Sequence, residues 1–396
     1  MRRSHCALLV ACALGAAACA TAPVSPEPPA PSAPVTARVV TPPAPLRQGG
    51  LAHLGYELVV ENVAAVPLTL TGLDVDADGA SWVRYDDAAL AARLRPLPGP
   101  EPPPGAPAAT LAPGGRAIIY LWLAAGADGA LPSALSHALS LSDGAQATWA
   151  ALAPVAVTEG APRSLSAPLA GAGWLAVNAP ANDSPHRRSV LDLGPAGVFL
   201  AQRYAVDLVR VGGPEGTHRG DPLRNDSYFA YGAEVLAGAD GVVVEVREDL
   251  PENVPGPESR AVAITPETIA GNHVIVDVGG GAFAVYAHLQ PGSVRVAEGE
   301  RVAEGDVLGL VGNSGNSTEP HLHVHVCDAP SVLRCQGLPF GFARFVEQEV
   351  HAPAAGEAGA APSLGPPVGR EGAMPADRAL IDFGAAAPMA ADPARR

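Results

Sequence analysis

Short apolar runs separated by turn residues fill the part of the chain from 51 to 162. Runs of alternating or β-branched apolar residues bounded by glycine, proline or aspartate predict strands, and four stand out: YELVVEN (56–62), PLTLTGLDV (67–75), RAIIYLWL (116–123) and HALSLS (137–142). Repeated short strands with turn signals predict an all-β, sandwich-like domain. Its isolated histidines, His53 and His137, are interpreted as ordinary surface or core residues, and the pattern does not indicate what this domain binds.

The part from 163 to 350 shows the same strand pattern with longer loops. The run 233–246 turns at Ala-Asp-Gly, and the run 272–289 predicts a hairpin with three glycines at its tip, where a positive φ costs little. Valine-rich runs with tight glycine turns follow between 294 and 316. Helix signals are few, so this region predicts an antiparallel β-fold, and the whole chain is expected to be all-β.

The two ends of the chain differ in composition from these regions. Residues 1–19 have two arginines, an apolar run and small residues before Cys19, the layout of a secretory signal peptide and too short for a membrane-spanning helix. The run AAAC resembles a bacterial lipobox, which would make Cys19 lipidated, although Ala16 stands where that motif usually has leucine. Proline-rich residues 20–50 predict a tether, and residues 351–396 predict a disordered tail.

Charge and cysteine content bear on the possible partners of the chain and on the state of its cysteines. Forty acidic against twenty-five basic side chains give a formal charge of −15, which argues against nucleic acid as a partner. Beyond the leader only Cys327 and Cys335 remain, together with Cys19 if that residue is lipidated. A cysteine pair with this short spacing in an exported protein predicts a disulfide more than a metal or redox site.

Histidines are concentrated in the second region. Seven of the eleven lie between His186 and His325, and His321, His323 and His325 alternate along the chain. Alternate side chains of a strand point to one face, so three imidazoles would line a single surface. Catalytic zinc takes three protein ligands and leaves a fourth position for water. The pattern predicts a metal site, with a solvent-facing polar strand edge as the alternative.

Several motifs together resemble one known family. Within residues 205–326, five segments are similar, in order, to the motifs of lysostaphin-type (LytM-like) zinc peptidoglycan endopeptidases: YGAEVLAGADGVV, GNHVIVDVGGG, VYAHL, VAEGDVLGLVGNSGNS and EPHLHVHV. The resemblance covers under a third of the chain. It implies an antiparallel β-sheet peptidase domain of the duplicated hybrid motif type with a substrate groove, one Zn²⁺ per chain, and the peptide cross-bridges of bacterial cell walls as substrate.

The resemblance also implies roles for individual residues. In the family's PHLH segment the first histidine acts in catalysis and the second binds zinc, which implies His321 and His323. The family's Tyr-x-His-Leu segment implies a second catalytic imidazole at His288, and an early aspartate ligand falls at Asp207 in RYAVDLV. The remaining ligand departs from the pattern. The family has HxxxD, but Arg203 stands four residues before Asp207, and a guanidinium has no lone pair to give.

Two further histidines complete the expected site. His186, in the run PHRR, is the candidate for the missing ligand, because strands joined by the 194–197 turn would run antiparallel and bring it beside Asp207. The alternatives are a surface histidine in a basic patch with the two following arginines, or a site that lacks this ligand. His325 could hydrogen-bond a ligand imidazole and fix its tautomer.

The combined expectation is an exported zinc metalloendopeptidase, lipid-anchored in the periplasm or outer membrane of a Gram-negative-type envelope. Zinc-activated water would attack a peptide carbonyl, His321 would move the proton and His288 would stabilise the oxyanion, although the two rings could exchange roles. The missing HxxxD keeps open a non-catalytic cell-wall module that activates a separate amidase. A metal-binding protein without hydrolytic activity is a third interpretation. Glycine–glycine and D-alanine–diaminopimelate bonds both stay open as substrates.

Overall fold

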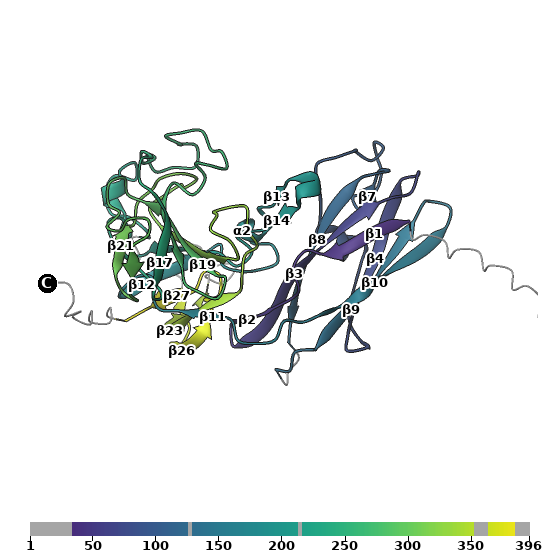
Figure 1. The fold of residues 1–396 in the computed structure, drawn as a ribbon, viewed down its shortest axis with the longest axis horizontal. Coiled ribbons are helices and arrows are strands. Elements are labelled where there is room, and N and C mark those ends of the chain that lie inside the picture. Colours follow the sequence, from purple (N-terminus) through teal and green to yellow (C-terminus); the bar gives the residue numbers. More distant parts are fainter. Residues whose placement is uncertain (1–33, 126–128, 213–215, 352–362, 385–396) are drawn as a thin grey trace, which may run out of the picture. The chain divides into compact units, whose positions relative to one another are not determined.

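The computed structural model describes residues 34–125, 129–212, 216–351 and 363–384. The predicted signal peptide, Cys19 and the first part of the predicted tether lie outside these residues. Within the described parts of the chain, no helix is both long and apolar enough to span a membrane. Nearly all regular structure is β, which confirms the predicted fold class (Figure 1).

Two five-stranded sheets build the first region. In one sheet the order is β1 (Val35–Val39), β3 (Leu51–Asn62), β8 (Arg116–Ala124) and β6 (Leu94–Pro96), with β2 (Pro45–Gln48) paired to β3. In the other the order is β10 (Ala147–Ala156), β9 (Ala134–Ser142), β4 (Leu68–Ala77) and β5 (Ala80–Asp86), with β7 (Thr110–Leu111) paired to β4. Helix α1 (Asp87–Ala91) follows β5. Both sheets contribute to one buried core that includes Leu58, Leu73 and Leu121.

The first two strands correct part of the predicted tether. Residues 34–50 contain β1 and β2, and both strands are hydrogen-bonded to β3. Leu46 of β2 is fully buried. The proline-rich composition concealed a short strand in VTARV, while Pro42 and Pro43 fall between the two strands, where a missing N–H breaks no ladder.

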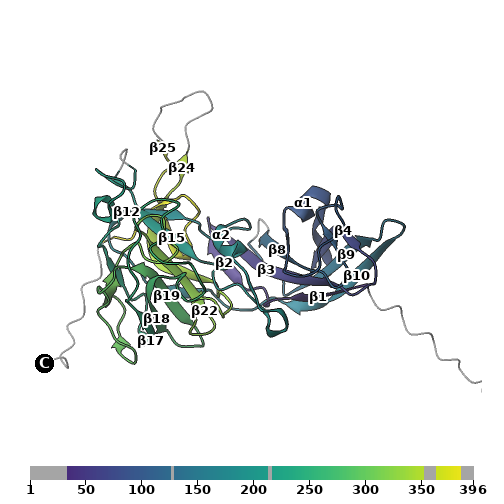
Figure 2. The same cartoon turned by 90° about the horizontal axis from the view of Figure 1, so that it is seen from above.

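An eleven-stranded sheet dominates the second region. Its order is β11 (Arg163–Leu165), β23 (Phe340–Gln348), β27 (Leu380–Asp382), β12 (Ala172–Val177), β15 (Val206–Arg210), β22 (Leu322–Cys327), β19 (Phe283–Leu289), β18 (Asn272–Asp277), β17 (Gly241–Arg247) and β20 (Arg301–Val302), with β26 (Val368–Ala373) paired to β23. Strands β22, β19, β18 and β17 lie side by side and antiparallel (Figure 2).

Short elements complete the second region. Three two-stranded ladders accompany the large sheet: β13 (Leu191–Asp192) with β14 (Val198–Phe199), β16 (Glu234–Leu236) with β21 (Val307–Leu310), and β24 (Val350–His351) with β25 (Ser363–Leu364). Helix α2 (Pro185–Arg188) and the 3₁₀ turns Gly194–Ala196 and Asn225–Ser227 are the helical segments described here. A disulfide joins Cys327, the last residue of β22, to Cys335.

The predicted disordered tail is wrong for residues 363–384. Strands β26 and β27 both pair with β23, and β27 also pairs with β12 inside the sheet. Met374 and Ile381 are buried in the core of the second region. Few apolar residues were needed, because these strands add to a sheet that already exists, and the pairing of β27 with the distant β12 leaves no local signal in the sequence.

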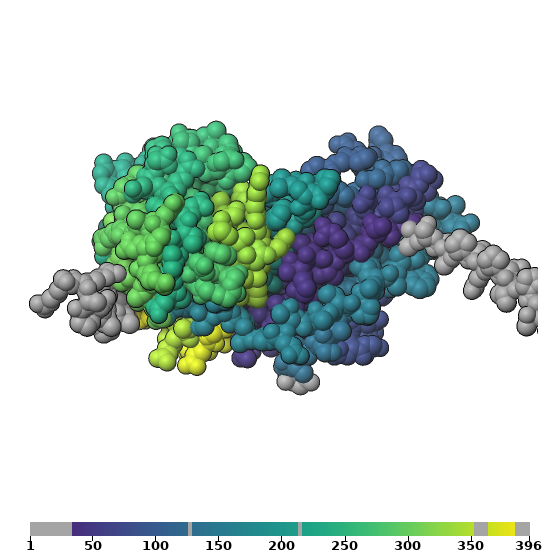
Figure 3. All heavy atoms as spheres, in the orientation of Figure 1, coloured from purple at the N-terminus to yellow at the C-terminus, as the bar shows by residue number. Residues whose placement is uncertain are grey.

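The two regions are in direct contact. From Pro34 onward they form one compact unit, and their atoms touch in the space-filling view (Figure 3). One crossing contact runs from Gln48 of β2, whose Nε2 donates to the carbonyl oxygen of Pro375 at 2.8 Å. The strands that precede the predicted first domain therefore also connect it to the second.

Candidate metal centre and active site

Three neighbouring strands carry most of the candidate residues. Strand β22 lies between β15 and β19, with His323 opposite Asp207 on one side and opposite Ala287 on the other. His288 follows Ala287, and His321 directly precedes β22. The residue after each of the three alternating histidines packs in the hydrophobic core: Leu322, Val324 and Val326. Side chains alternate along a strand, so the three histidines line the opposite face, as their spacing predicted.

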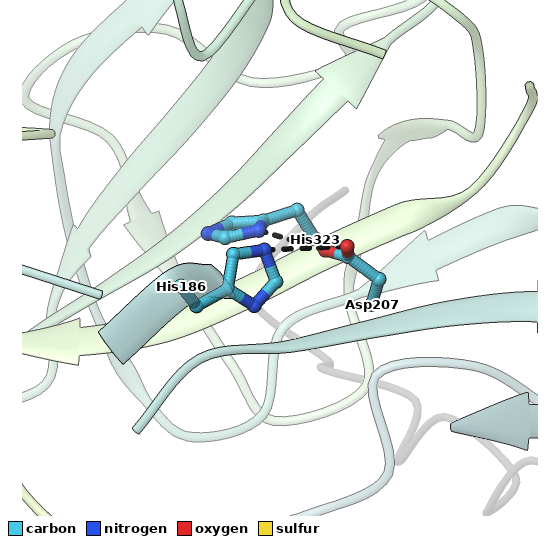
Figure 4. Close-up of side chains that lie close together, drawn as sticks. All are labelled: His186, Asp207 and His323. Carbon is cyan, nitrogen blue, oxygen red and sulfur yellow. Dashed lines mark hydrogen bonds and ion pairs between the residues drawn. The ribbon is translucent and has the colours of Figure 1, made fainter. Parts of the chain in front are cut away.

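His186, Asp207 and His323 form a compact cluster (Figure 4). The Nε2 atom of His186 lies 3.2 Å from Oδ2 of Asp207, and Nδ1 of His323 lies 2.8 Å from Oδ1. One atom from each residue lies within 4.8 Å of the others. The structure thus brings the candidate replacement ligand beside the two residues that the resemblance implied.

The route that brings His186 to Asp207 differs from the predicted one. His186 lies on α2, before the β13–β14 hairpin, rather than on a strand of that hairpin. The proximity comes from β12, which pairs with β15 so that Val177 lies opposite Asp207. The chain leaves β12 at Asn178 and reaches α2 within a few residues, so α2 lies next to the aspartate. The surface-patch alternative is wrong for Arg187, which is 0% exposed.

Asn178 connects two of the candidate ligands and was not found from the sequence. Its Nδ2 donates to Oδ2 of Asp207 at 2.9 Å. Its carbonyl oxygen accepts hydrogen bonds from His186 Nδ1 and Ser184 Oγ, both at 3.0 Å. Nδ1 of His186 therefore donates to this carbonyl, and Nε2, the nitrogen that faces Asp207, is the one that could lose its proton to bind a metal. An asparagine after a strand signals only a turn, so nothing in the local sequence indicates this role.

His325 contacts the far side of the His323 ring. Its Nδ1 lies 2.9 Å from Nε2 of His323. Burial, and then the neighbouring His323, hold the pKa of His325 well below its usual range, so the ring is neutral. If Nδ1 of His323 supplies a lone pair to a metal, its Nε2–H can donate to Nδ1 of His325. This is the contact expected of a residue that fixes the tautomer of a ligand.

His288 and His321 form a second pair, with ring centroids 4.7 Å apart. Nδ1 of His288 donates to the carbonyl oxygen of Ser314, and Nδ1 of His321 donates to the carbonyl oxygen of Glu319, both at 2.8 Å. Each ring therefore keeps Nε2 for other partners. Nε2 of His321 lies 3.5 Å from Oδ1 of Asp207. The backbone carbonyl of Ser314 thus fixes the His288 tautomer.

The electrostatics of the cluster centre on Asp207. Burial alone would raise the pKa of this carboxyl, but charge interactions with His186 and His321 outweigh it and hold the pKa well below the usual range. The same interactions raise the pKa of His186 and His321 against the opposing effect of burial. No arginine among the described residues forms an ion pair with Asp207.

The donor set fits a divalent cation. A buried carboxylate needs a positive partner, and here it faces imidazoles whose outer nitrogens are bonded to backbone carbonyls or another imidazole. Two histidine nitrogens and one carboxylate oxygen are one of the ligand sets found in catalytic zinc sites, which leave a fourth position open. A cavity of about 300 Å³ adjoins the cluster. Beyond the histidines and Asp207, its lining includes Gln202, Arg260, Ile269, Asn316, Thr318 and Val332.

Comparison with known families bears on the same segment. Residues 225–332 match peptidase family M23. The chain contains an M23 peptidase domain. The matched segment of this M23 domain includes His288, His321 and His323, whereas His186 and Asp207 precede it.

Two curated relatives match part of the chain. Peptidoglycan DD-endopeptidase ShyA of Vibrio cholerae is 33% identical over 131 residues, which are 31% of this chain and 26% of that protein. Cell division protein DipM of Caulobacter vibrioides is 30% identical over 112 residues, 28% of this chain and 18% of that protein. The chain therefore spans about a quarter or less of the length of these relatives.

A solved structure shows similarity at lower sequence identity. The catalytic domain of lysostaphin from Staphylococcus simulans is 22% identical, with a TM-score of 0.21 over 33% of this chain and 70% of that one. The assignment of the M23 domain therefore rests on the family match and the curated relatives.

Proposed function

We propose that this chain is an exported zinc metalloendopeptidase that hydrolyses peptide cross-links of bacterial peptidoglycan. The observation that carries the proposal is the cluster of His186, Asp207 and His323 beside the paired rings of His288 and His321, all lining one cavity. The similarity of part of the chain to a peptidoglycan DD-endopeptidase supports the substrate class. Lipidation at Cys19 and a periplasmic or outer-membrane location belong to the same proposal and rest on the leader sequence.

Three residues would hold Zn²⁺: His186 through Nε2, Asp207 through a carboxylate oxygen and His323 through Nδ1. Zinc bound there would polarise a peptide carbonyl and lower the pKa of a water molecule in the open position. Asn178 would keep the carboxylate of Asp207 oriented, and His325 would accept the Nε2–H of His323. Such outer hydrogen bonds set ligand tautomers and raise ligand basicity.

His288 and His321 would move protons during the reaction. Burial, and then the charges of His321 and His323, hold the pKa of His288 well below its usual range, and it would fall further beside a bound cation. The neutral His288 ring, with Nδ1 donating to Ser314, presents a lone pair on Nε2. This favours His288 as the proton acceptor and His321 as the donor to the oxyanion and leaving amine, the exchanged form of the expected roles.

The alternative of a non-catalytic activator of an amidase needs neither proton-transfer ring. Both His288 and His321 are buried, and both have their Nδ1 atoms fixed by carbonyl oxygens. Fixing two tautomers so that both Nε2 atoms are left for other partners suits proton transfer during catalysis. This arrangement favours the enzyme.

Zinc content and cell-wall digestion test the proposal together. We expect about one zinc per chain in the wild type and little in His186→Ala, because two ligands bind zinc much more weakly than three. His288→Ala should keep its zinc and lose hydrolysis of purified peptidoglycan, measured by mass spectrometry of released fragments. These fragments also identify the bond that is cut.

Three results would count against parts of this proposal. Zinc retained in His186→Ala would remove this residue from the metal site. Metal loss in His288→Ala would overturn its catalytic role. A wild type without zinc or hydrolysis would favour the amidase-activating module.

A further inference from the structure

A carboxylate of the first region lies buried between two arginines of the second. Glu57 of β3 is 0% exposed, and so is Arg187. Nη2 of Arg187 lies 2.9 Å from Oε1 of Glu57. On the other oxygen, Nε of Arg203 donates to Oε2 at 2.9 Å, and Arg203 is 2% exposed. This cluster of Glu57, Arg187 and Arg203 is called the Glu57 clamp below.

The two arginines of the Glu57 clamp are close in sequence to two of the candidate metal ligands. Arg187 immediately follows His186 on α2, and Arg203 stands four residues before Asp207. One carboxylate therefore holds the two segments that deliver two of the three candidate ligands. Among the described residues, no side-chain hydrogen bond or ion pair joins either arginine to His186, Asp207 or His323, so any effect on metal binding passes through the backbone of these segments.

The guanidinium of Arg187 is enclosed by residues of the first region. Its Nη2 donates to the carbonyl oxygens of Tyr56 and Leu121, both at 2.8 Å. The guanidinium lies 5.2 Å from the ring centre of Trp122, within the range of cation–π attraction. A Cβ atom added to Gly55 would lie 2.6 Å from Nη1 of Arg187. The absence of a side chain at Gly55 is therefore what admits the arginine.

Arg203 connects the same carboxylate to the loop that follows the disulfide. Its Nη1 donates to the carbonyl oxygen of Gly337 at 2.8 Å, and its Nη2 donates to Oε1 of Gln336 at 2.9 Å. The next residue, Tyr204, donates its hydroxyl to the carbonyl oxygen of Gly55 at 2.6 Å. The side chains of the α2 segment and of the Arg203 segment therefore contact adjacent residues of β3.

Stability alone is a poor reason for such a cluster. Burying ions costs several kcal/mol each by general estimates, and apolar replacements of similar volume are often as stable. Orientation is a better reason here. Helix α2 has only four residues, and no side chain caps its N-terminus. Helices this short are not stable by themselves, so the direction of His186 depends on what anchors α2.

We propose that Glu57 is a positioning residue of the metal centre. Through Arg187 and Arg203 it fixes the segments that carry His186 and Asp207, so the first β-region is part of the scaffold that forms the zinc site. This proposal rests on the proposed zinc site. It gives the first region a role in metal binding, whichever bond in the cell wall is cut.

Glu57→Gln tests the proposal with little change in shape. The control is Asp192→Asn, which alters a second ion pair between the same regions, since Nη2 of Arg116 on β8 lies 2.7 Å from Oδ2 of Asp192. Zinc affinity is measured in the full chain by competition with a chromogenic chelator, and the visible spectrum of the Co²⁺ form reports ligand geometry. Thermal unfolding of the metal-free proteins measures stability separately.

In Glu57→Gln we expect the zinc dissociation constant to rise about tenfold, the low end of the range for residues that hydrogen-bond a ligand directly, because Glu57 acts one residue further away, and we expect an altered Co²⁺ spectrum. Asp192→Asn should keep wild-type affinity and spectrum even where its unfolding temperature falls. Wild-type affinity in folded Glu57→Gln would overturn the proposal. Equal weakening in both variants would also overturn it, because the contact between regions would then act without any special part for Glu57.

A second variant keeps the test decisive if Glu57→Gln does not fold. Gly55→Ala keeps every charge but displaces the Arg187 guanidinium and the Trp122 ring beside it, so it should weaken zinc binding in the same direction. Unchanged zinc affinity in folded Gly55→Ala would overturn the proposal. A wild type that binds no zinc would instead remove the zinc site itself, and with it the reason for positioning.

Discussion

At the scale of single residues, backbone carbonyl oxygens decide which imidazole nitrogens are available for chemistry. Asn178, Ser314 and Glu319 each accept a hydrogen bond from the Nδ1 atom of a different site histidine. The Nε2 atoms of His186, His288 and His321 are left for metal or substrate. The chemistry of the site thus depends on where these backbone carbonyls lie, and the types of the three residues do not reveal it.

Asn178 permits a test in which side chain and backbone are separated. Its φ of 53° lies in the left-handed region, where glycine is unstrained. We expect Asn178→Gly to keep the carbonyl contact with His186 but lose the amide contact with Asp207, which should weaken zinc binding about tenfold. Asn178→Ala should lose the same amide contact and also about 1 kcal/mol of stability from left-handed strain.

Chelator competition measures the zinc affinity of these two variants, and urea unfolding measures their stability. Wild-type affinity in both would show that the amide of Asn178 does not support Asp207. Equal stability of the glycine and alanine variants would contradict the strain argument. A loss of zinc in Asn178→Ala alone would assign the effect to the backbone.

At the scale of elements, the disulfide lies at the end of the strand that carries the ligand His323. Cys327 ends β22, and Cys335 is eight residues further along the chain. Closing a loop of this size should stabilise the protein by about 2–3 kcal/mol through the entropy of the unfolded chain. In the double variant Cys327→Ala with Cys335→Ala, the free energy of urea unfolding should be lower by that amount.

Reductant supplies the matched comparison for this variant. Wild-type protein is reduced until thiol titration shows that both cysteines are free. This reduced protein should unfold like the double variant, and reductant should not change the unfolding of the double variant. Identical unfolding of the oxidised and fully reduced wild type would contradict a stabilising bond.

The elements also show what a single sequence could and could not predict. The alternation of histidines on β22 is local, so the shared face of His321, His323 and His325 was predictable. Strands β1, β26 and β27 were missed because each contributes few apolar residues, and β27 also pairs with β12, which lies far away in sequence. Helix α2 was missed because four residues carry no period. The Glu57 clamp was invisible, since a glutamate within a strand gives no sign of its partners more than a hundred residues away.

At the scale of the whole molecule, buried contacts such as the Glu57 clamp join the two regions. We therefore expect them to unfold in one transition, so that a titrating group in one core changes the stability of the whole chain. His137 of β9 is such a group. It is buried in the first region, where its Nε2 lies 2.8 Å from the hydroxyl of Tyr56. Burial lowers its pKa from 6.5 to about 4.

The sign of the pH effect follows from this lowered pKa. Above pH 6.5 His137 is neutral whether the chain is folded or unfolded, and the stability associated with it is fully present. As the pH falls from 6.5 toward 4, the unfolded chain binds a proton that the folded chain does not, so stability is lost. By pH 4.5 the loss should be about 2–3 kcal/mol.

His137→Gln keeps an acceptor for the Tyr56 hydroxyl but cannot titrate. The free energy of urea unfolding is measured at pH 7 and at pH 4.5 for both proteins. Its decrease between these two pH values should be smaller in the variant than in the wild type by the amount given above. An equal decrease in both proteins would show that His137 is not the group responsible.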